Sequence, residues 1–501
     1  MININALIAQ LPPEATNISH DSRNLEAGDL YIALKGSTHN GADYINAAIE
    51  KGASAILFEA SPAYQAPHQA AHQAAKDCKF IQVENARLVL SLLARHFASK
   101  GKKSQPDRVV AVTGTNGKSS VVEFYRQLFE MQACTTASIG TMGVITHPHH
   151  LGNDLPVFHH ALTTPDPAEL AQILAMLANK DVQCLAMEAS SHGLAQYRLD
   201  GIKIMAAAFT NLSHDHLDYH GDMETYRAAK YRLFTDILVA GGCMVLQAGS
   251  RAEKDLSPLV KQRHLFKLTY ALPEDEGDAD LKITSYKTLQ TGTLVSLSIL
   301  QDYKFNVFVG LIGRFQLKNM LAAVGLALAS GFSPTSIGHY LRGLHAVAGR
   351  MEWIGQTQNG GSIFVDYAHT PDALSVVLGD VRPYFKGKLH VVFGCGGNRD
   401  QEKRAIMGKI AAQNADHIII TDDNPRDEDP AHIRSMIMTK CKHATEIGDR
   451  AKAIRHAISK LGADDCLIVA GKGHETVQIS NGKSVPFSDK QIIERALSEE
   501  V

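Results

Sequence analysis

The strongest constraint on the fold is an apolar run that leads directly into a glycine-containing loop and then into a helical pattern. The apolar residues 109–112 precede the loop Thr113-Gly114-Thr115-Asn116-Gly117-Lys118-Ser119. Apolar side chains then recur at the spacing of one helix face, at Val121, Phe124, Tyr125, Leu128 and Phe129. This order predicts a buried strand, a turn, and a helix that begins near Ser119.

The loop has the composition of a phosphate-binding loop. Its glycines allow backbone N–H groups to approach phosphate oxygens, and the positive end of the following helix adds to the attraction. Lys118 is placed to reach the terminal phosphates of ATP, and the Ser119 hydroxyl to bind Mg²⁺. The first glycine of the general pattern is replaced by Val112, so the loop is not a generic one. The sequence predicts an ATP-using enzyme.

Length, charge and cysteine content narrow the class of protein. At about 100–200 residues per domain, 501 residues predict about three domains. A formal net charge of -2 gives no general field for nucleic acid or an anionic membrane. The seven scattered cysteines are typical of a reducing compartment, and the sequence has no run of about 18 apolar residues to span a membrane. We expect a cytoplasmic monomer with no membrane insertion and no nucleic-acid partner.

Three regions separate by pattern, with expected boundaries at 1–105, 106–346 and 347–501. The polar stretch 100–106 is typical of a linker, and the alternation of Thr, Ser, Val and Leu over 281–309 predicts antiparallel β structure. The third region repeats short apolar runs, each followed by a polar or glycine-rich motif, at Leu389–Phe393, His417–Thr421 and Cys466–Ala470. That rhythm predicts a parallel α/β sheet with ligands at the carboxyl ends of its strands.

Two more motifs follow predicted strands in the second region. The first is Met187-Glu188-Ala189-Ser190-Ser191-His192-Gly193, and the second, over 209–220, is dense in histidines and carboxylates. Such density at a strand end indicates metal or phosphate handling. Beside a phosphate loop the interpretation is stronger, because Mg²⁺ takes oxygen ligands close to phosphates.

The loop 113–119, Glu188-Ala189-Ser190-Ser191 and Asn211-Leu212-Ser213-x-Asp215-His216-Leu217-Asp218, in this order, resemble the motifs of the Mur ligase family. Those enzymes add amino acids to UDP-N-acetylmuramoyl precursors of peptidoglycan. The resemblance implies an α/β protein of three domains: an N-terminal UDP-binding domain, a central P-loop-type ATP-binding domain and a C-terminal Rossmann-like domain. It also implies that ATP phosphorylates a substrate carboxylate and that an amine then displaces phosphate to form an amide.

The resemblance assigns roles to residues around the phosphate loop. It implies catalytic roles for Lys118, Glu188, His216 and Lys230, and metal ligation by Ser119, Glu188, His216 and a carbamate on Lys230. An unmodified ammonium beside Mg²⁺ would be repelled, whereas a carbamate resembles a carboxylate ligand. The implied ATP contacts are Gly114, Thr115, Asn116, Gly117, Lys118, Ser119, Ser120, Asn319 at the start of a helix, Arg350, Asp366 and His369.

The N-terminal region resembles the domain that binds UDP-MurNAc-L-Ala-D-Glu in the members that extend this dipeptide. The implied contacts are Ser22, Ser37, Thr38, His39, Thr163, Thr164, Ser190, Gln196 and Arg198. Leu162 stands where some members carry Asn, which is a departure from the family's pattern. The histidines at 147, 149, 150, 159 and 160 have no regular ligand spacing, and we interpret 147–160 as a surface hairpin.

Asp423-Asn424-Pro425-Arg426 is similar to the signature of the members that add meso-diaminopimelate. This amino acid differs from lysine by a second carboxylate, which an arginine binds with a two-pronged fork. The resemblance adds Arg399, Gly471 and Glu475 to the amino-acid site. Two alternatives remain open: a lysine-adding or other Mur-type ligase, and a nucleotide-gated binding protein without catalysis.

Overall fold

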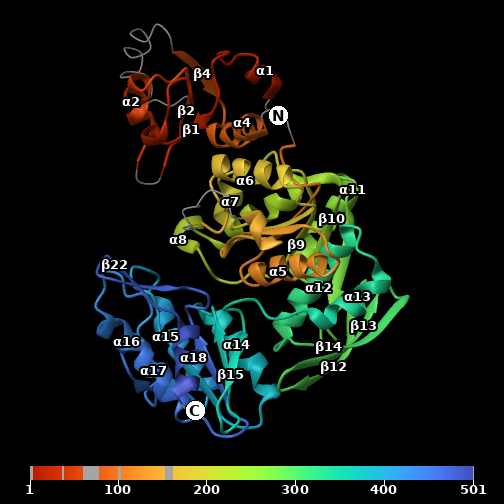
Figure 1. The fold of residues 1–501 in the computed structure, drawn as a ribbon, viewed down its shortest axis with the longest axis vertical. Helices are drawn as coiled ribbons and strands as arrows, with labels where there is room; N and C mark the ends of the chain where they lie inside the picture. The colour runs from red at the N-terminus through yellow and green to blue at the C-terminus, as the bar shows by residue number, and fades with distance from the viewer. Residues whose placement is uncertain (1–3, 37–38, 60–77, 100–102, 153–161, 500–501) are drawn as a thin grey trace.

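The computed structural model describes residues 4–36, 39–59, 78–99, 103–152 and 162–499. Three sheets follow one another along the chain, of four, ten and six strands, and a small two-stranded hairpin lies near the C-terminus. Figure 1 shows the N-terminal segment at the top, the C-terminal segment at the bottom, and the central segment between them. Every segment combines helices with a sheet, so the predicted α/β class is confirmed.

The N-terminal segment is a parallel sheet in the order β1-β2-β3-β4. Its apolar core is joined by Ala171, on a helix of the central segment, which packs with Val89, Leu90 and Leu93. The N-terminal sheet is therefore fastened to the central segment through two helices, α4 and α6. The elements are α1 (Ile4–Ile8), β1 (Ile18–Ser19), β2 (Leu30–Ala33), α2 (Ile45–Glu50), β3 (Ala55–Glu59), β4 (Lys79–Val83), α4 (Ala86–Ser99) and, in the central segment, α6 (Pro167–Asn179).

The central segment is built on a ten-stranded sheet in the order β14-β13-β12-β11-β10-β9-β5-β8-β6-β7. Its strands are β5 (Arg108–Thr113), β6 (Thr136–Gly140), β7 (Gly143–His147), β8 (Cys184–Glu188), β9 (Ile204–Phe209), β10 (Leu238–Gln247), β11 (Phe266–Ala271), β12 (Leu281–Leu289), β13 (Gly292–Ile299) and β14 (Tyr303–Val309). Its other helices are α5 (Lys118–Glu130), α7 (Ser191–Ala195), α8 (Leu217–His220), α9 (Met223–Arg232), α10 (Arg251–Leu256), α11 (Leu259–Gln262), α12 (Arg314–Ala329) and α13 (Ile337–Tyr340).

Strand β5 lies in the middle of this sheet, paired in parallel with β8 and β9. Val110 and Val112 pack into the apolar core on one face, and Val109 and Ala111 into the core on the other. Because both faces are covered, the strand is continuously apolar. Because β5, β8 and β9 run the same way, the three motifs that follow them meet at one edge of the sheet.

The C-terminal segment is a six-stranded sheet in the order β15-β16-β20-β17-β18-β19. Its strands are β15 (Glu352–Gln356), β16 (Ser362–Asp366), β17 (Leu389–Phe393), β18 (His417–Ile420), β19 (Thr445–Glu446) and β20 (Cys466–Ala470), and the hairpin is β21 (Val477–Ser480) with β22 (Lys483–Pro486). Its helices are α14 (Pro371–Val381), α15 (Glu402–Asn414), α16 (Pro430–Met438), α17 (Arg450–Ile458) and α18 (Asp489–Glu499).

Most of the predicted elements are confirmed, with small differences. The helix after the phosphate loop begins at Lys118, one residue early, and residues 281–309 form the antiparallel strands β12–β14. The third sheet is parallel except at its edge, where β15 pairs antiparallel with β16. Across the described part of the chain, no helix is both long enough and apolar enough to cross a bilayer.

Candidate active site

The phosphate loop requires glycine at two places. Gly114 has a φ of +143°, and a Cβ there would lie 1.9 Å from the Thr210 hydroxyl oxygen at the end of β9. Gly117, just before α5, has a φ of +86°, and its Cβ would lie 2.4 Å from Asn319 Oδ1. The loop is therefore pressed against the neighbouring strand end on one side and α12 on the other, with space only for hydrogen at both α-carbons.

Two lysines converge on the same backbone oxygen. Lys118 Nζ donates to the carbonyl oxygens of Gly114, at 3.0 Å, and Thr115, at 2.7 Å. Lys230 Nζ, from α9, also donates to the Gly114 oxygen, at 2.7 Å, and lies 4.5 Å from the centre of the Tyr226 ring. Burial, together with the nearby Lys118 charge, holds the pKa of Lys230 well below its ordinary value. A neutral amine is the reactive form of such a side chain.

Glu188, the last residue of β8, is held on two sides. Its Oε1 accepts hydrogen bonds from the Ser119 hydroxyl, at 2.8 Å, and from the Thr141 backbone N–H, at 2.9 Å. Its Oε2 accepts from the Thr141 hydroxyl at 3.1 Å. The carboxylate fits here only because residue 140 is a glycine, since a Cβ at that position would lie 2.2 Å from Oε1. Ser119 and Glu188 thus place two oxygen donors beside the phosphate loop, which is the donor chemistry that Mg²⁺ prefers.

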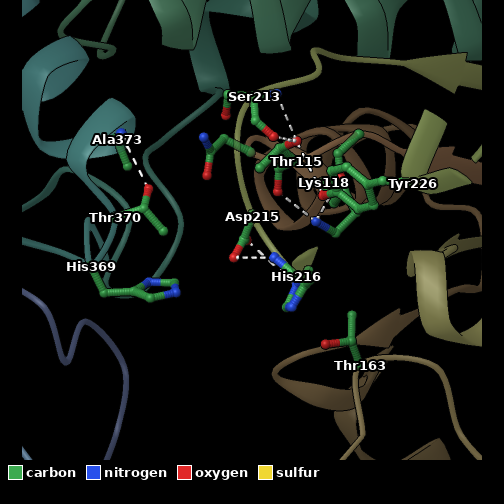
Figure 2. Close-up of polar contacts among 12 residues, drawn as sticks. Thr115, Lys118, Thr163, Ser213, Asp215, His216, Tyr226, His369, Thr370 and Ala373 are labelled. Carbon is green, nitrogen blue, oxygen red and sulfur yellow. Dashed lines mark hydrogen bonds and ion pairs between the residues drawn. The ribbon is translucent and has the colours of Figure 1, made fainter. Parts of the chain in front are cut away.

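The segment after β9 packs directly against the phosphate loop. Asn211 Oδ1 accepts from the Asn116 N–H at 2.9 Å, and the Thr115 hydroxyl accepts from the Ser213 N–H at 3.0 Å. Asp215 lies 3.4 Å from the ring of His216, which is half exposed, and Figure 2 shows both close to Lys118. Partial burial lowers the pKa of His216 from its ordinary value, against the opposing charge of Asp215.

Within the described residues, no group of three or more His, Cys, Asp or Glu side chains is arranged to hold a metal ion. Among the chain's histidines, His147 ends β7 and forms an ion pair with Glu130 at 2.8 Å. The remainder of the predicted 147–160 hairpin lies mostly outside the described residues.

Residues of the C-terminal segment also contact the phosphate loop. Arg350 Nη2 donates to the Ser119 hydroxyl at 3.1 Å, and its guanidinium lies 4.2 Å from the centre of the Tyr367 ring. Asn116 donates to Asp372 across the same junction at 3.3 Å. Figure 2 shows His369 and Thr370 from this segment opposite Lys118 and His216.

Asp366 is buried at the end of β16, in the same segment. Its two oxygens accept hydrogen bonds from the N–H groups of Met351, at 2.8 Å, and Ala368, at 2.7 Å. Burial raises its pKa to about 6, although Arg350 opposes the change. His369 Nδ1 lies 2.8 Å from the Tyr367 carbonyl oxygen, and burial lowers its pKa. Asp366 therefore holds the backbone just before β15 and just after β16.

Asn319 and Ser120 lie on helices that border the loop. Asn319 lies in the second turn of α12 rather than at its start, because the helix begins directly after Gly313. Its amide donates to Gln316 Oε1 at 3.2 Å, and Gln316 in turn donates to the Arg350 carbonyl oxygen at 3.0 Å. Ser120 is buried in the first turn of α5.

A cavity of about 890 Å³ opens between the N-terminal and central segments. Of the predicted dipeptide-side residues, it is lined by Ser22, His39, Gln196 and Arg198, and Leu162 also lines it. Arg198 donates to the Thr164 carbonyl oxygen and to Gln196 Oε1, both at 2.7 Å. The predicted contacts at positions 37 and 38 lie outside the described residues. The cavity therefore gathers residues from positions far apart in the sequence.

Thr163, Thr164 and Ser190 connect this side of the molecule to Glu188. The hydroxyls of Thr164 and Ser190 lie 3.0 Å apart, and Thr164 Oγ1 donates to the Glu188 carbonyl oxygen at 3.0 Å. Thr141 Oγ1 lies 3.4 Å from Thr163 Oγ1, and Thr141 also binds the Glu188 carboxylate. The phosphate loop and the predicted dipeptide residues are thus linked by direct contacts.

The residues predicted to bind the amino-acid substrate gather at the carboxyl ends of the strands of the third sheet. Asn424 Nδ2 donates to Glu475 Oε2 at 2.9 Å, and a Cβ on Gly471 would lie 2.6 Å from Asp423 Oδ2. Arg426 Nη1 donates to the Gly397 carbonyl oxygen at 2.7 Å. Pro425 is buried between these residues, whereas Arg399 is exposed on the loop that follows β17. Six of the seven residues form one cluster, and Arg399 lies at its rim.

Two residues outside the predicted set belong to these clusters. Thr141, in the turn of the β6–β7 hairpin, binds both oxygens of Glu188, and no motif in the sequence marks it. Lys472 is fully buried and donates to Asn424 Oδ1 at 3.0 Å and to Glu475 Oε2 at 2.9 Å. Its position between Gly471 and Gly473, directly after a buried strand, is a signal that identifies it.

The comparisons with known proteins agree with this geometry. Family models match residues 14–98 (Mur ligase family, catalytic domain), 112–327 (Mur ligase middle domain) and 349–473 (Mur ligase, glutamate ligase domain). The UDP-N-acetylmuramoyl-L-alanyl-D-glutamate--2,6-diaminopimelate ligase of Bradyrhizobium diazoefficiens is 42% identical over 491 residues, which are 97% of this chain and 96% of that protein. The protein of the same name from Caulobacter vibrioides is 42% identical, over 95% of this chain and 94% of its own.

A solved structure of a protein with that name has a similar fold. Its TM-score to this chain is 0.68 at 31% identity, and the match covers 97% of this chain and 95% of that one. The family models together span most of the chain, and the relatives align over nearly all of it. The chain belongs to the Mur ligase family.

Proposed function

We propose that this chain is an ATP-dependent ligase that joins meso-diaminopimelate to the γ-carboxylate of D-Glu in UDP-N-acetylmuramoyl-L-alanyl-D-glutamate, a step in making peptidoglycan precursors. The observation that carries the proposal is the line of contacts that connects three clusters. Ser119 and Glu188 border the phosphate loop, Thr141 links Glu188 to Thr163 on the dipeptide side, and Arg350 reaches Ser119 from the segment that holds Arg426. The names of the full-length relatives agree with this choice of substrates.

The chemistry takes place in two steps. A carboxylate oxygen of the dipeptide attacks the γ-phosphorus of ATP, which gives an acyl phosphate and ADP. The amine of diaminopimelate then attacks the acyl carbon, phosphate leaves with the electron pair of the breaking C–O bond, and the amine loses a proton. Two steps are needed because a carboxylate is unreactive toward amines at neutral pH, whereas an acyl phosphate carries a good leaving group.

The chain would position the phosphates and exclude water. The N–H groups of residues 114–119 and the start of α5 would bind the phosphates, and Lys118 would neutralise charge that develops during transfer. The residues that would hold Mg²⁺ are Ser119, Glu188, His216 and a carbamate on Lys230, and the ion would supply further charge neutralisation. Arg350, Asp366 and His369 would close the nucleotide side and keep water from the acyl phosphate.

The carbamate on Lys230 has support from its surroundings. The amine is 1% exposed, shares the Gly114 oxygen with Lys118 and has a lowered pKa. An uncharged amine adds to CO₂ to give a carbamate and a proton. The product places a negative charge where the neutral amine stood, and that charge faces the Lys118 ammonium, so the carbamate gains a favourable charge interaction.

The remaining regions bind the other two substrates. We assign the three domains to residues 1–105, 106–346 and 347–501. The cavity lined by Ser22, His39, Gln196 and Arg198, between the first two domains, would receive the UDP-sugar and its peptide. The cluster of Asp423, Asn424, Arg426, Gly471 and Glu475 would bind diaminopimelate, with Arg399 at its rim. All seven cysteines are free thiols, which fits action in a reducing compartment such as the cytoplasm.

The test is phosphate release with paired substrates. Release should require ATP, Mg²⁺, the UDP-linked dipeptide and meso-diaminopimelate together, and should fall to background when any one is withheld. Release with L-lysine in place of diaminopimelate would instead identify a lysine-adding enzyme. Nucleotide binding without release under any combination would identify a binding protein and overturn the proposal.

A further inference from the structure

A fully buried ion pair lies directly beneath the proposed amino-acid site. Arg450, the first residue of α17, donates from Nε and Nη2 to the two carboxylate oxygens of Asp489, each at 2.7 Å. Both side chains have 0% exposure. Asp489 is the first residue of α18, the last helix in the described part of the chain. The pair therefore joins the start of two helices in the interior of the C-terminal segment.

The same guanidinium also binds the ends of two strands. Nη2 donates to the carbonyl oxygen of Ala470, the last residue of β20, at 2.9 Å. Nη1 donates at 3.5 Å to the carbonyl oxygen of Asp422, which lies just beyond β18. Gly471 follows Ala470 directly, and Asp423 follows Asp422. Arg450 thus contacts the residue immediately before each of the two loops that carry the proposed diaminopimelate contacts.

The sheet itself does not join these two strands. Strand β17 lies between β20 and β18 in the sheet order, so no ladder of hydrogen bonds runs directly from one to the other. Side chains of the two loops meet above the sheet, where Lys472 donates to Asn424. Arg450 provides a second connection, at the base of the loops, and makes it to backbone oxygens. Its planar fork holds several acceptors in a fixed geometry.

Energetics favour a positional role for this pair. A buried ion pair loses much of its Coulomb attraction to the cost of desolvation, so its net contribution to stability is often small. Loss of one partner, by contrast, leaves a buried charge and unpaired carbonyl oxygens. Because the net stability gained from the pair is small, its contacts with the two strand ends are the feature that points to a positional role.

We propose that Arg450, held by Asp489, is a positioning residue that sets the separation between loops 423–426 and 471–475, and through it the preference for an amino acid with a second carboxylate. The inference rests on the proposed function, because the two loops are assigned to diaminopimelate there. Arg450 acts through Asp423, Arg426 and Glu475 and does not touch the substrate itself. Asp489, at the start of α18, fixes the orientation of the Arg450 guanidinium through two hydrogen bonds.

The experiment compares Arg450→Lys, Arg450→Met and Asp489→Asn with the wild-type protein. A matched control is His390→Gln, because His390 lies 3.3 Å from Asp465 in a buried pair near the start of β17 and β20, at the opposite end of these strands from the Arg450 contacts. We expect the KM for meso-diaminopimelate to rise at least tenfold in the Arg450 and Asp489 variants, while the KM for ATP stays within about twofold. The ratio of kcat/KM for diaminopimelate over L-lysine should fall, with Arg450→Lys the least affected. The control should lower the Tm without changing the KM for meso-diaminopimelate or this kcat/KM ratio.

Hydrogen exchange provides a readout that does not depend on turnover. Amides of 421–426 and 471–475 should exchange faster in Arg450→Lys than in wild type, with no such change in His390→Gln. A lowered Tm with an unchanged KM for diaminopimelate and unchanged exchange in both loops would overturn the inference. Absence of diaminopimelate-dependent phosphate release by the wild-type protein would instead overturn the proposed function, so the two failures are distinguishable.

Discussion

The Nζ atom of Lys230 donates a 2.7 Å hydrogen bond to the carbonyl oxygen of Gly114. That oxygen belongs to the phosphate loop and also accepts from Lys118. Two amines that share one acceptor in a buried site repel each other when both are charged. The relationship explains why the pKa of Lys230 is held well below its ordinary value by burial and by Lys118.

The first prediction concerns the reaction of Lys230 with CO₂. Because its pKa is lowered, the amine is uncharged over a range of pH in which an exposed lysine is protonated. Wild-type protein in ¹³C-bicarbonate should show a carbamate resonance by NMR that weakens as the pH falls through the depressed pKa. Lys230→Ala should lack the resonance and lose phosphate release, whereas Lys254→Ala, at an exposed position on α10, should behave as wild type. Identical spectra for wild type and Lys230→Ala would contradict the carbamate.

The second prediction concerns Glu188 and its support by Thr141. Glu188→Gln removes the negative charge beside Ser119, so turnover should fall by about 10²-fold or more, and half-saturation should require more Mg²⁺. Thr141→Val removes only the hydroxyl that binds Oε2 and should raise the Mg²⁺ requirement by about 10-fold, as loss of a supporting hydrogen bond does at metal sites. Titrations of phosphate release against Mg²⁺ measure both effects. Equal Mg²⁺ dependence in all three proteins would exclude Glu188 as a ligand.

The third prediction concerns selectivity at Arg426. Loss of a charge-assisted pair with the second carboxylate should cost about 2–4 kcal/mol of binding, a rise of roughly 30- to 700-fold in KM for diaminopimelate. Arg426→Ala should show this rise and lose discrimination against L-lysine. Arg426→Lys keeps the charge without the fork and should lie between the two. The exposed Arg495→Ala on α18 is the control, and an unchanged KM in Arg426→Ala would refute the role.

The sequence is informative where one segment contains the whole signal. The phosphate loop, the Glu188 motif and Asp423–Arg426 each follow a short apolar run, so their position at strand ends could be predicted. The order of strands could not, because the placement of β5 between β8 and β9 depends on crossovers that leave no local pattern. Thr141 is a small polar residue in a hairpin turn, and only the pairing of β6 with β8 brings it to Glu188.

Long-range pairs were beyond prediction for the same reason. Arg450 and Asp489 begin two different helices, and no local pattern in the sequence links one residue to the other. Their contact depends on how α17 and α18 pack on the same face of the third sheet. For Asn319 the sequence predicts the helix but not the position within it. Its place in the second turn of α12 depends on the helix beginning directly after Gly313.

The last prediction uses the raised pKa of Asp366. Burial raises this pKa to about 6 in the folded protein, from an ordinary value of 3.8. Between these two values the folded state binds more protons than the unfolded state, so the contribution of Asp366 to stability falls as the pH rises through this window. The shift corresponds to roughly 3 kcal/mol, fully lost above pH 6. Asp366→Asn has no such titration. From pH 4 to pH 7 the unfolding free energy of the wild type should therefore fall relative to that of the variant.

The chain offers a local probe for this measurement. Its single tryptophan, Trp353, pairs with Phe364 on β16, the strand that ends at Asp366, so fluorescence during denaturant unfolding reports this sheet. Glu494→Gln, which removes an exposed carboxylate on α18, is the control and should follow the wild-type curve. If the curves of wild type and Asp366→Asn ran parallel between pH 4 and pH 6, Asp366 would not titrate in this window, and the raised pKa would be wrong. A converging difference confined to that window would locate the proton on the carboxylate that holds Met351 and Ala368 in place.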